Sequence, residues 1–155
     1  MTRKPIKIDV DQIRREAEET YAAGGFSCSE TVVLVVMRHL DPDMPERMIA
    51  ASTGFAMGVG RSKCLCGAVT GGAMCLGYMF GRTRPNEPGN EKCLALVNEM
   101  QESFRQAYKG VLCCHVYLQD VEFASPERKA RCGGFVGQVA GKVAEIVARE
   151  LGARD

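Results

Sequence analysis

The chain has 155 residues, a net charge of +1 and no basic block, so it lacks the electrostatic footprint of a nucleic-acid-binding protein. Its apolar content of 46% and charged content of 25% are those of a soluble globular protein, and we expect one domain over residues 1–155. The longest apolar run, residues 32–37, is too short to cross a bilayer, and the polar N-terminus has no signal segment. We therefore expect a cytoplasmic protein without membrane insertion.

The first half of the chain has clear helix signals. Asp9 can cap a first helix, which the glycine pair at 24–25 ends. A capping box at 27–30 precedes the apolar run, which favours a buried helix over a strand there. A start signal with proline at 43–46 begins a third helix, and a glycine-rich loop follows over residues 54–61. These signals predict three helices before the loop.

The second half of the chain also favours helices. We expect a fourth helix over residues 66–80, although each glycine in a helix interior costs about 1 kcal/mol, so that close packing against another element or a cofactor must compensate. Asn90 caps an amphipathic helix with Leu94, Val97, Met100, Phe104 and Tyr108 on its apolar face. A short element follows at 113–118, a helical stretch starts at 125–127, and a last helix carries apolar residues over 135–151. The sequence thus predicts an all-α bundle of about six to seven helices with glycine-rich helix contacts.

Eight cysteines in a chain from a reducing compartment favour metal binding, catalysis or redox sensing over structural disulfides. Cys28 and Cys66 lie where helices should begin, and free amides and the helix dipole lower the pKa of a thiol there. Cys132 stands just before the final helical run. If these helix starts converge, four thiolates would suit zinc or an iron–sulfur cluster, whereas two close thiols without a metal would suit disulfide exchange.

No local spacing is typical of a known cofactor motif. The cysteine pairs at 64–66 and 113–114 are not C-x-x-C motifs, and the ferredoxin spacings and the C-x-x-C-H haem-attachment motif are absent. The glycine runs lack the context of a phosphate-binding or dinucleotide-binding loop, so turns and close helix crossings explain them better. We interpret Cys75 and Cys93 as small buried residues of the core.

The segment 66–71, Cys-Gly-Ala-Val-Thr-Gly, resembles the C-G-A-x-x-G motif of a bacterial and archaeal family of redox-active proteins that have four such cysteines, the C_GCAxxG_C_C type. The other cysteine segments of that family are matched around Cys28, Cys114 and Cys132, with Cys113 as an alternative to Cys114. The resemblance covers about residues 10–150 and implies a helical domain related to the split-Soret cytochromes, which hold haem and an iron–sulfur cluster at such cysteines. Because this chain lacks a haem-attachment motif, we do not expect covalent haem.

We predict one redox site at which Cys28, Cys66, Cys114 and Cys132 converge from helix N-termini, with Gly67 and Gly71 beside a cofactor. The site would either bind an iron–sulfur cluster for electron transfer or cycle between dithiol and disulfide, as an electron carrier or an oxidoreductase. A structural zinc module without redox activity and a purely structural role for every cysteine are the alternatives. We expect another redox protein as the partner, and the glycine faces at 67–71 and 133–141 would serve a homodimer or the protein's own core.

Overall fold

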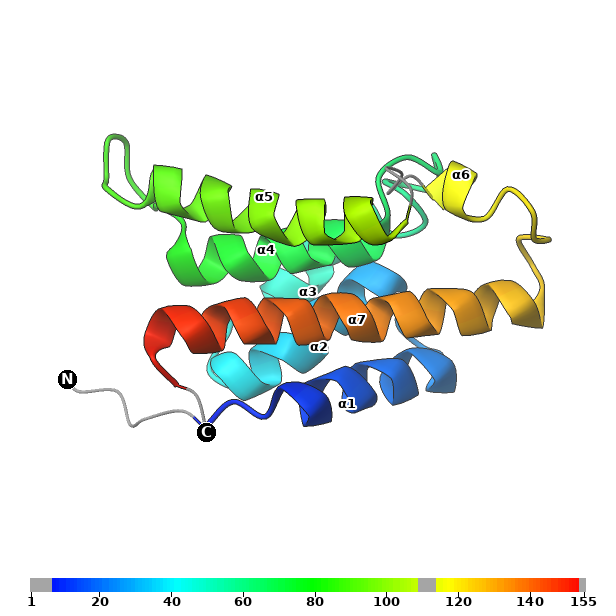
Figure 1. Cartoon of the computed structure of the whole chain (residues 1–155), viewed down its shortest axis with the longest axis horizontal. Coiled ribbons are helices and arrows are strands. Elements are labelled where there is room, and N and C mark those ends of the chain that lie inside the picture. Colours follow the sequence, from blue (N-terminus) through cyan, green and yellow to red (C-terminus); the bar gives the residue numbers. More distant parts are fainter. Residues whose placement is uncertain (1–6, 109–113, 154–155) are drawn as a thin grey trace.

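The computed structural model of the protein describes residues 7–108 and 114–153 (Figure 1). Its helices are α1 (Val10–Ala23), α2 (Cys28–Leu40), α3 (Arg47–Ser52), α4 (Gly67–Phe80), α5 (Asn90–Ala107), α6 (Cys114–Tyr117) and α7 (Pro126–Leu151), and a 3₁₀ turn, η1 (Thr53–Phe55), follows α3. The described residues contain no strand, so the prediction of an all-α fold is confirmed. None of the described helices is both long and apolar enough to cross a membrane.

The longest helix, α7, lies in the middle of the bundle, with α4 and α5 on one side and α1 on the other (Figure 1). It packs against α1, α2 and α4, while α4 also packs against α2 and α5. Apolar side chains from five helices are fully buried between them, among them Ile13, Val33, Val36, Leu76, Met100, Val139 and Ile146. Burial of these side chains is the main term that holds the helices together.

Two predicted helix starts are formed by the expected side chains. The Asp9 carboxylate accepts a hydrogen bond from the Gln12 amide at 2.9 Å and caps α1. The Ser27 amide donates to the Glu30 carboxylate at 2.7 Å, as one half of the capping box that begins α2. Because this box fixes the first turn of α2, it also fixes the position of Cys28, the first residue of that helix.

The last part of the chain differs from the prediction. Residues 126–151 form one helix of 26 residues, capped by Ser125, instead of a short helical stretch and a separate last helix. The glycine pair at 133–134 does not interrupt α7, because Gly133 packs closely against the ring of Tyr21 in α1. Cys132 consequently lies in the second turn of α7, so the prediction that this cysteine opens a helix was wrong.

The predicted face of α5 is also wrong at one position. Leu94, which we placed on the apolar face, is 56% exposed, and the buried residues of the helix are Leu96, Met100 and Phe104. The N-cap is Gly89, in a left-handed conformation, and Asn90 is the first helical residue, so the prediction that Asn90 caps this helix was wrong. The contacts of α5 with α4 and α7, which sequence periodicity does not specify, select the face that is buried.

The two glycine faces, at 67–71 in α4 and 133–141 in α7, provide close contacts between helices of the same chain. A Cβ atom on Gly137 of α7 would overlap the side chain of Glu18 in α1. A Cβ atom on Gly71 of α4 would lie 2.9 Å from the carbonyl oxygen of Ser29 in α2. Close packing therefore compensates for the free-energy cost of the glycines in these helices, as expected. The homodimer stays a prediction.

The glycine-rich loop before α4 has an unusual backbone. Four residues other than glycine have φ between 53° and 65°, namely Met57, Val59, Arg61 and Lys63, and Gly58 and Gly60 alternate with them. Hydrogen bonds from the Lys63 amide to the Met57 carbonyl (3.1 Å) and from the Cys64 amide to the Gly58 carbonyl (3.0 Å) close the loop. Left-handed residues other than glycine are unfavourable by about 1–2 kcal/mol each, and such strain is concentrated at functional sites. The loop leads directly to Cys66 and α4.

Candidate four-cysteine redox site

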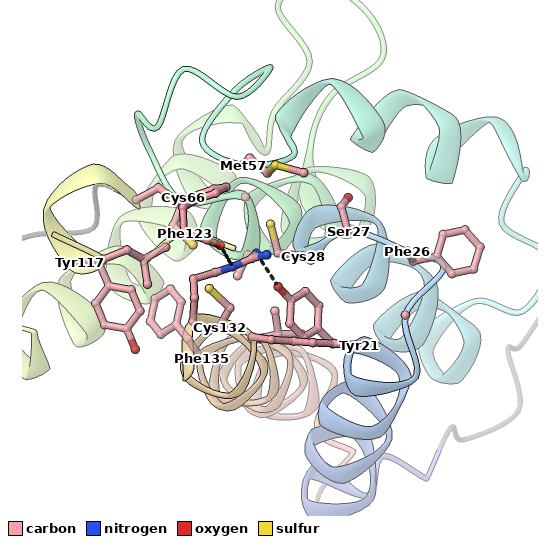
Figure 2. A pocket seen from close by; sticks show the side chains of 18 of the residues that line it. Tyr21, Phe26, Ser27, Cys28, Met57, Cys66, Tyr117, Phe123, Cys132 and Phe135 are labelled. Carbon is pink, nitrogen blue, oxygen red and sulfur yellow. Dashed lines mark hydrogen bonds between the residues drawn. The ribbon is translucent and has the colours of Figure 1, made fainter. Parts of the chain in front are cut away.

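One end of the bundle contains a cavity of about 410 Å³ (Figure 2). It lies where α1 ends and where α2, α4, α6 and α7 begin. Its walls combine sulfur-containing, aromatic and basic side chains, and the cysteines in them are Cys28, Cys66, Cys114 and Cys132. The fold thus brings together four cysteines from four helical segments that are far apart in the sequence, while their role as ligands or redox thiols stays a prediction.

Cys28 and the start of α4 meet at a glycine. Cys28 is the first residue of α2, Cys66 is the N-cap of α4, and Gly67 follows it as the first residue of α4. A Cβ atom on Gly67 would lie only 2.5 Å from the Cys28 sulfur. Gly67, which lines the cavity, is therefore needed for the approach of Cys28, whereas Gly71 packs against α2 and is not in the described lining.

The thiol of Cys66 does not have the lowered pKa that its position predicted. Burial raises the pKa of Cys66 well above its ordinary value, and the negative charges that Cys28 and Cys114 can carry raise it further. The backbone amides of Ala68 and Val69 donate to the Cys66 sulfur and lower its pKa, but they do not outweigh burial. Without a bound cation, Cys66 consequently keeps its proton at neutral pH.

Cys132 has a cationic neighbour. Burial is the largest effect and raises the pKa of Cys132, while the Arg128 guanidinium and the Tyr21 hydroxyl, which both contact its sulfur, lower it. Burial first, and then the negative charge that Cys132 can carry, raise the pKa of Tyr21, while the Arg128 charge lowers it. Arg128 precedes Cys132 by four residues in α7, so both side chains lie on one face of that helix.

Cys114 is the first residue of α6 and is buried. Its amide donates to the carbonyl of Cys64 at 2.8 Å, which ties α6 to the segment that leads into α4. Cys113 lies outside the described residues, so the structure describes only one of the two alternative cysteines. Among the described residues, it is Cys114 that lines the cavity.

The other three described cysteines lie outside the lining of this cavity. Cys64 is exposed, although it is only two residues from Cys66. Cys75 is buried in the core, which confirms its interpretation as a small core residue, and burial raises its pKa to about 12. Cys93 is only half-buried and is not part of the buried core, so the same interpretation was wrong for it; its sulfur lies 3.9 Å from the carbonyl oxygen of Leu76.

The sequence does not indicate the other residues that line the cavity with the cysteines. Arg128, Phe123 and Met57 line the cavity, and Tyr21, which the sequence placed on the apolar face of the first helix, lines it as well. The spacing of Arg128 and Cys132 could have indicated a shared helix face, but only if one continuous helix had been predicted there. No sequence signal connects Phe123 or Met57 with the cysteines.

The four cavity cysteines are chemically suited to two kinds of metal centre. Cysteine thiolates are soft ligands that suit iron–sulfur clusters and zinc. Four sulfurs on one zinc ion would be about 3.8 Å apart, because Zn–S bonds of about 2.3 Å point to the corners of a tetrahedron. Within residues 7–108 and 114–153, no three or more Cys, His, Asp or Glu side chains are placed to hold a metal ion. The chemistry of the four cysteines therefore suits an iron–sulfur cluster or zinc, and among the described residues their sulfurs are not preassembled around one ion.

The fold resembles that of a known iron-containing protein. Split-Soret cytochrome c from Desulfovibrio desulfuricans ATCC 27774, described as having a novel iron centre, is similar with a TM-score of 0.70 over 97% of this chain and 72% of the cytochrome chain. The two sequences are 22% identical, so this similarity concerns the fold. No match was found among curated proteins. A family model described as "Putative redox-active protein (C_GCAxxG_C_C)" matches residues 26–146, which include all four cavity cysteines, and the chain belongs to this family.

Proposed function

We propose that the protein is an electron carrier whose four cavity cysteines bind an iron–sulfur cluster. The observation that carries this proposal is the arrangement of Cys28, Cys66, Cys114 and Cys132 around one cavity. Such clusters are held by four cysteine thiolates and, when bound, accept and return single electrons. The redox-active family and the iron centre of the similar cytochrome support the same chemistry. We further propose a redox protein as the partner and the reducing cytoplasm as the location.

The protein's own residues would position the sulfurs and compensate their charge. The amides of Ala68 and Val69 donate to the Cys66 sulfur and would stabilise negative charge on it. Phe135 and Tyr117 line the cavity with aromatic carbon. Because burial keeps the Cys66 thiol protonated, its ligation would release a proton, and binding would weaken as the pH falls.

Disulfide exchange is the second candidate, and one contact favours it. The Cys28 sulfur lies against Gly67, the residue that follows Cys66, so these two cysteines are neighbours across the α2–α4 contact. Oxidation would form one S–S bond between them and transfer two electrons and two protons to an acceptor disulfide, which becomes two thiols. A structural zinc module is the third candidate, for which the sulfurs would have to move closer to one another.

Metal and sulfide analysis of the protein tests the proposal. The protein would be purified without oxygen, reconstituted with ferrous iron and sulfide, and analysed for iron, sulfide and zinc. We expect iron and sulfide in similar amounts in the wild-type protein and a loss of most of both in Cys66→Ser. The matched control is Cys64→Ser, because Cys64 is exposed and outside the cavity lining, and this variant should retain both.

Three results would contradict the cluster. A colourless protein without iron and sulfide after reconstitution excludes it, and a reversible disulfide in that protein would favour the second candidate. Stoichiometric zinc that survives iron reconstitution would favour the zinc module. Equal losses of iron in Cys64→Ser and Cys66→Ser would show that the cavity is not the binding site.

A further inference from the structure

The Arg128 side chain is fixed at the cavity by two neighbouring residues. Its Nε donates to the carbonyl oxygen of Phe123 at 2.7 Å, and its Nη1 donates to the Tyr21 hydroxyl at 3.4 Å, the two hydrogen bonds drawn in Figure 2. Its Cζ atom also lies 4.8 Å from the centre of the Phe123 ring. An arginine held in this way presents its positive charge at a defined place, because the planar guanidinium loses its rotational freedom to these contacts.

The charge of Arg128 is directed at the cysteines. Arg128 and Cys132 both line the cavity from the same face of α7, and the guanidinium contacts the Cys132 sulfur. Lys129 also lines the cavity, but its side chain is exposed, so water and salt screen its charge. Arg128 is half-buried among aromatic rings, where screening is weaker.

Arg131, a second arginine of α7, differs from Arg128 because it is paired with carboxylates. Arg131 pairs with Asp120 at 2.8 Å and with Glu127 at 3.3 Å, and it is not in the described lining of the cavity. Among the described residues, no ion pair joins Arg128 to a carboxylate. The charge of Arg131 is therefore compensated by its neighbours, whereas the charge of Arg128 lies beside the Cys132 sulfur.

We propose that Arg128, positioned by Tyr21 and Phe123, sets the reduction potential of the four-cysteine site. This inference rests on the proposed function. In the redox step, one electron passes from a one-electron donor protein to the site, so that the donor is oxidised by one electron and the site becomes more negative by one charge. Arg128 keeps its proton throughout and stabilises the more negative state. It thereby determines which donors are strong enough to reduce the site.

Redox titration of reconstituted variants tests this role. Wild type, Arg128→Gln, Arg128→Lys, Tyr21→Phe and the control Arg131→Gln would be loaded with ferrous iron and sulfide and titrated with dithionite in the presence of mediators. For Arg128→Gln we expect at least a tenfold lower ratio of reduced to oxidised site at a given potential, which is about 59 mV for a one-electron couple. Arg128→Lys and Tyr21→Phe should shift the potential less in the same direction, and Arg131→Gln should leave it unchanged.

The outcomes separate this inference from the proposed function. An unchanged potential in Arg128→Gln with wild-type iron content overturns the role of Arg128 and leaves the cluster in place. An equal shift in Arg131→Gln overturns it too, because the effect would then come from the overall charge. If Arg128→Gln does not fold or takes up no iron, the potentials of Arg128→Lys and Tyr21→Phe are used instead. Unchanged potentials in both of these variants, with wild-type iron content, overturn the role of Arg128. A wild-type protein without iron and sulfide overturns both proposals, and metal analysis, not the potential, reveals that case.

Discussion

Gly67 determines how closely two of the cavity cysteines approach each other. It follows Cys66 at the start of α4, and the Cys28 sulfur occupies the space beside it. A Cβ atom at this position would lie 2.5 Å from that sulfur and 2.8 Å from the carbonyl oxygen of Phe55. The sulfur could rotate away, but the carbonyl belongs to the backbone of η1 and cannot yield without moving the loop. The first glycine of the C-G-A-x-x-G motif, Gly67, therefore has a steric role, because it leaves space for the Cys28 sulfur and the Phe55 carbonyl.

We predict that Gly67→Ala lowers both the iron content and the stability of the protein. The added methyl group would displace Cys28 or the first turn of α4, and overpacking of this kind lowers the free energy of unfolding by about 1–3 kcal/mol. Urea unfolding combined with iron analysis measures both effects. The control is Gly77→Ala in the same helix, where a Cβ atom meets nothing within 4 Å and a gain of up to about 1 kcal/mol is expected. Identical behaviour of the two variants would contradict the steric role.

At the level of elements, an ion pair joins the outer helix α5 to the central helix α7. The Arg149 guanidinium donates to both oxygens of Glu99, at 2.7 and 2.8 Å. These hydrogen bonds are the largest influence on Glu99 and lower the pKa of its carboxyl group below the usual value of 4.5. The geometry is bidentate, which makes this pair stronger than a typical surface ion pair.

We predict a pH-dependent loss of stability in Glu99→Gln. A carboxyl group whose pKa is lowered by folding adds stability above its unfolded pKa, and that stability is lost as the pH falls through the folded value. The variant should therefore be less stable than wild type by about 0.5–1 kcal/mol at pH 7, with the difference disappearing as the pH falls below 4.5. Urea unfolding at several pH values measures it, and a difference that persists in acid would contradict the account. Glu102→Gln, which removes a pair within α5, should have a smaller effect.

The boundaries of the helices were predictable where neighbouring residues in the sequence determine them. Caps at Asp9 and Ser27 act through neighbouring residues, so the sequence was sufficient to predict the starts of α1 and α2. The continuity of α7 was not predictable, because Gly133 is accommodated by Tyr21, more than a hundred residues earlier in the chain. The exposure of Leu94 has a similar cause, since the packing of α5 and not its periodicity selects the buried face.

At the level of the whole molecule, the cysteines of the candidate site were predictable but their environment was not. Helix-start signals and the family motif pointed to Cys28 and Cys66, and both line the cavity. The raised pKa of Cys66 could not be predicted, because it depends on burial by segments that converge only after folding. Arg128 lines the cavity beside the Cys132 sulfur and contacts Tyr21 because α7 begins where α1 ends, an arrangement that no local pattern specifies.

The central claim is that four sulfurs form a single site, and alkylation resolved by cysteine tests it most directly. Iodoacetamide labelling rates would be measured by mass spectrometry in the reconstituted protein and after iron removal. We expect labelling of Cys28, Cys66, Cys114 and Cys132 to accelerate together when iron is removed, while the exposed Cys64 is labelled equally fast in both forms. Two results would contradict the claim. One is that any of the four cysteines is labelled at the same rate before and after iron removal, although the reconstituted protein contains iron. The other is that bound iron slows the labelling of Cys64 as well.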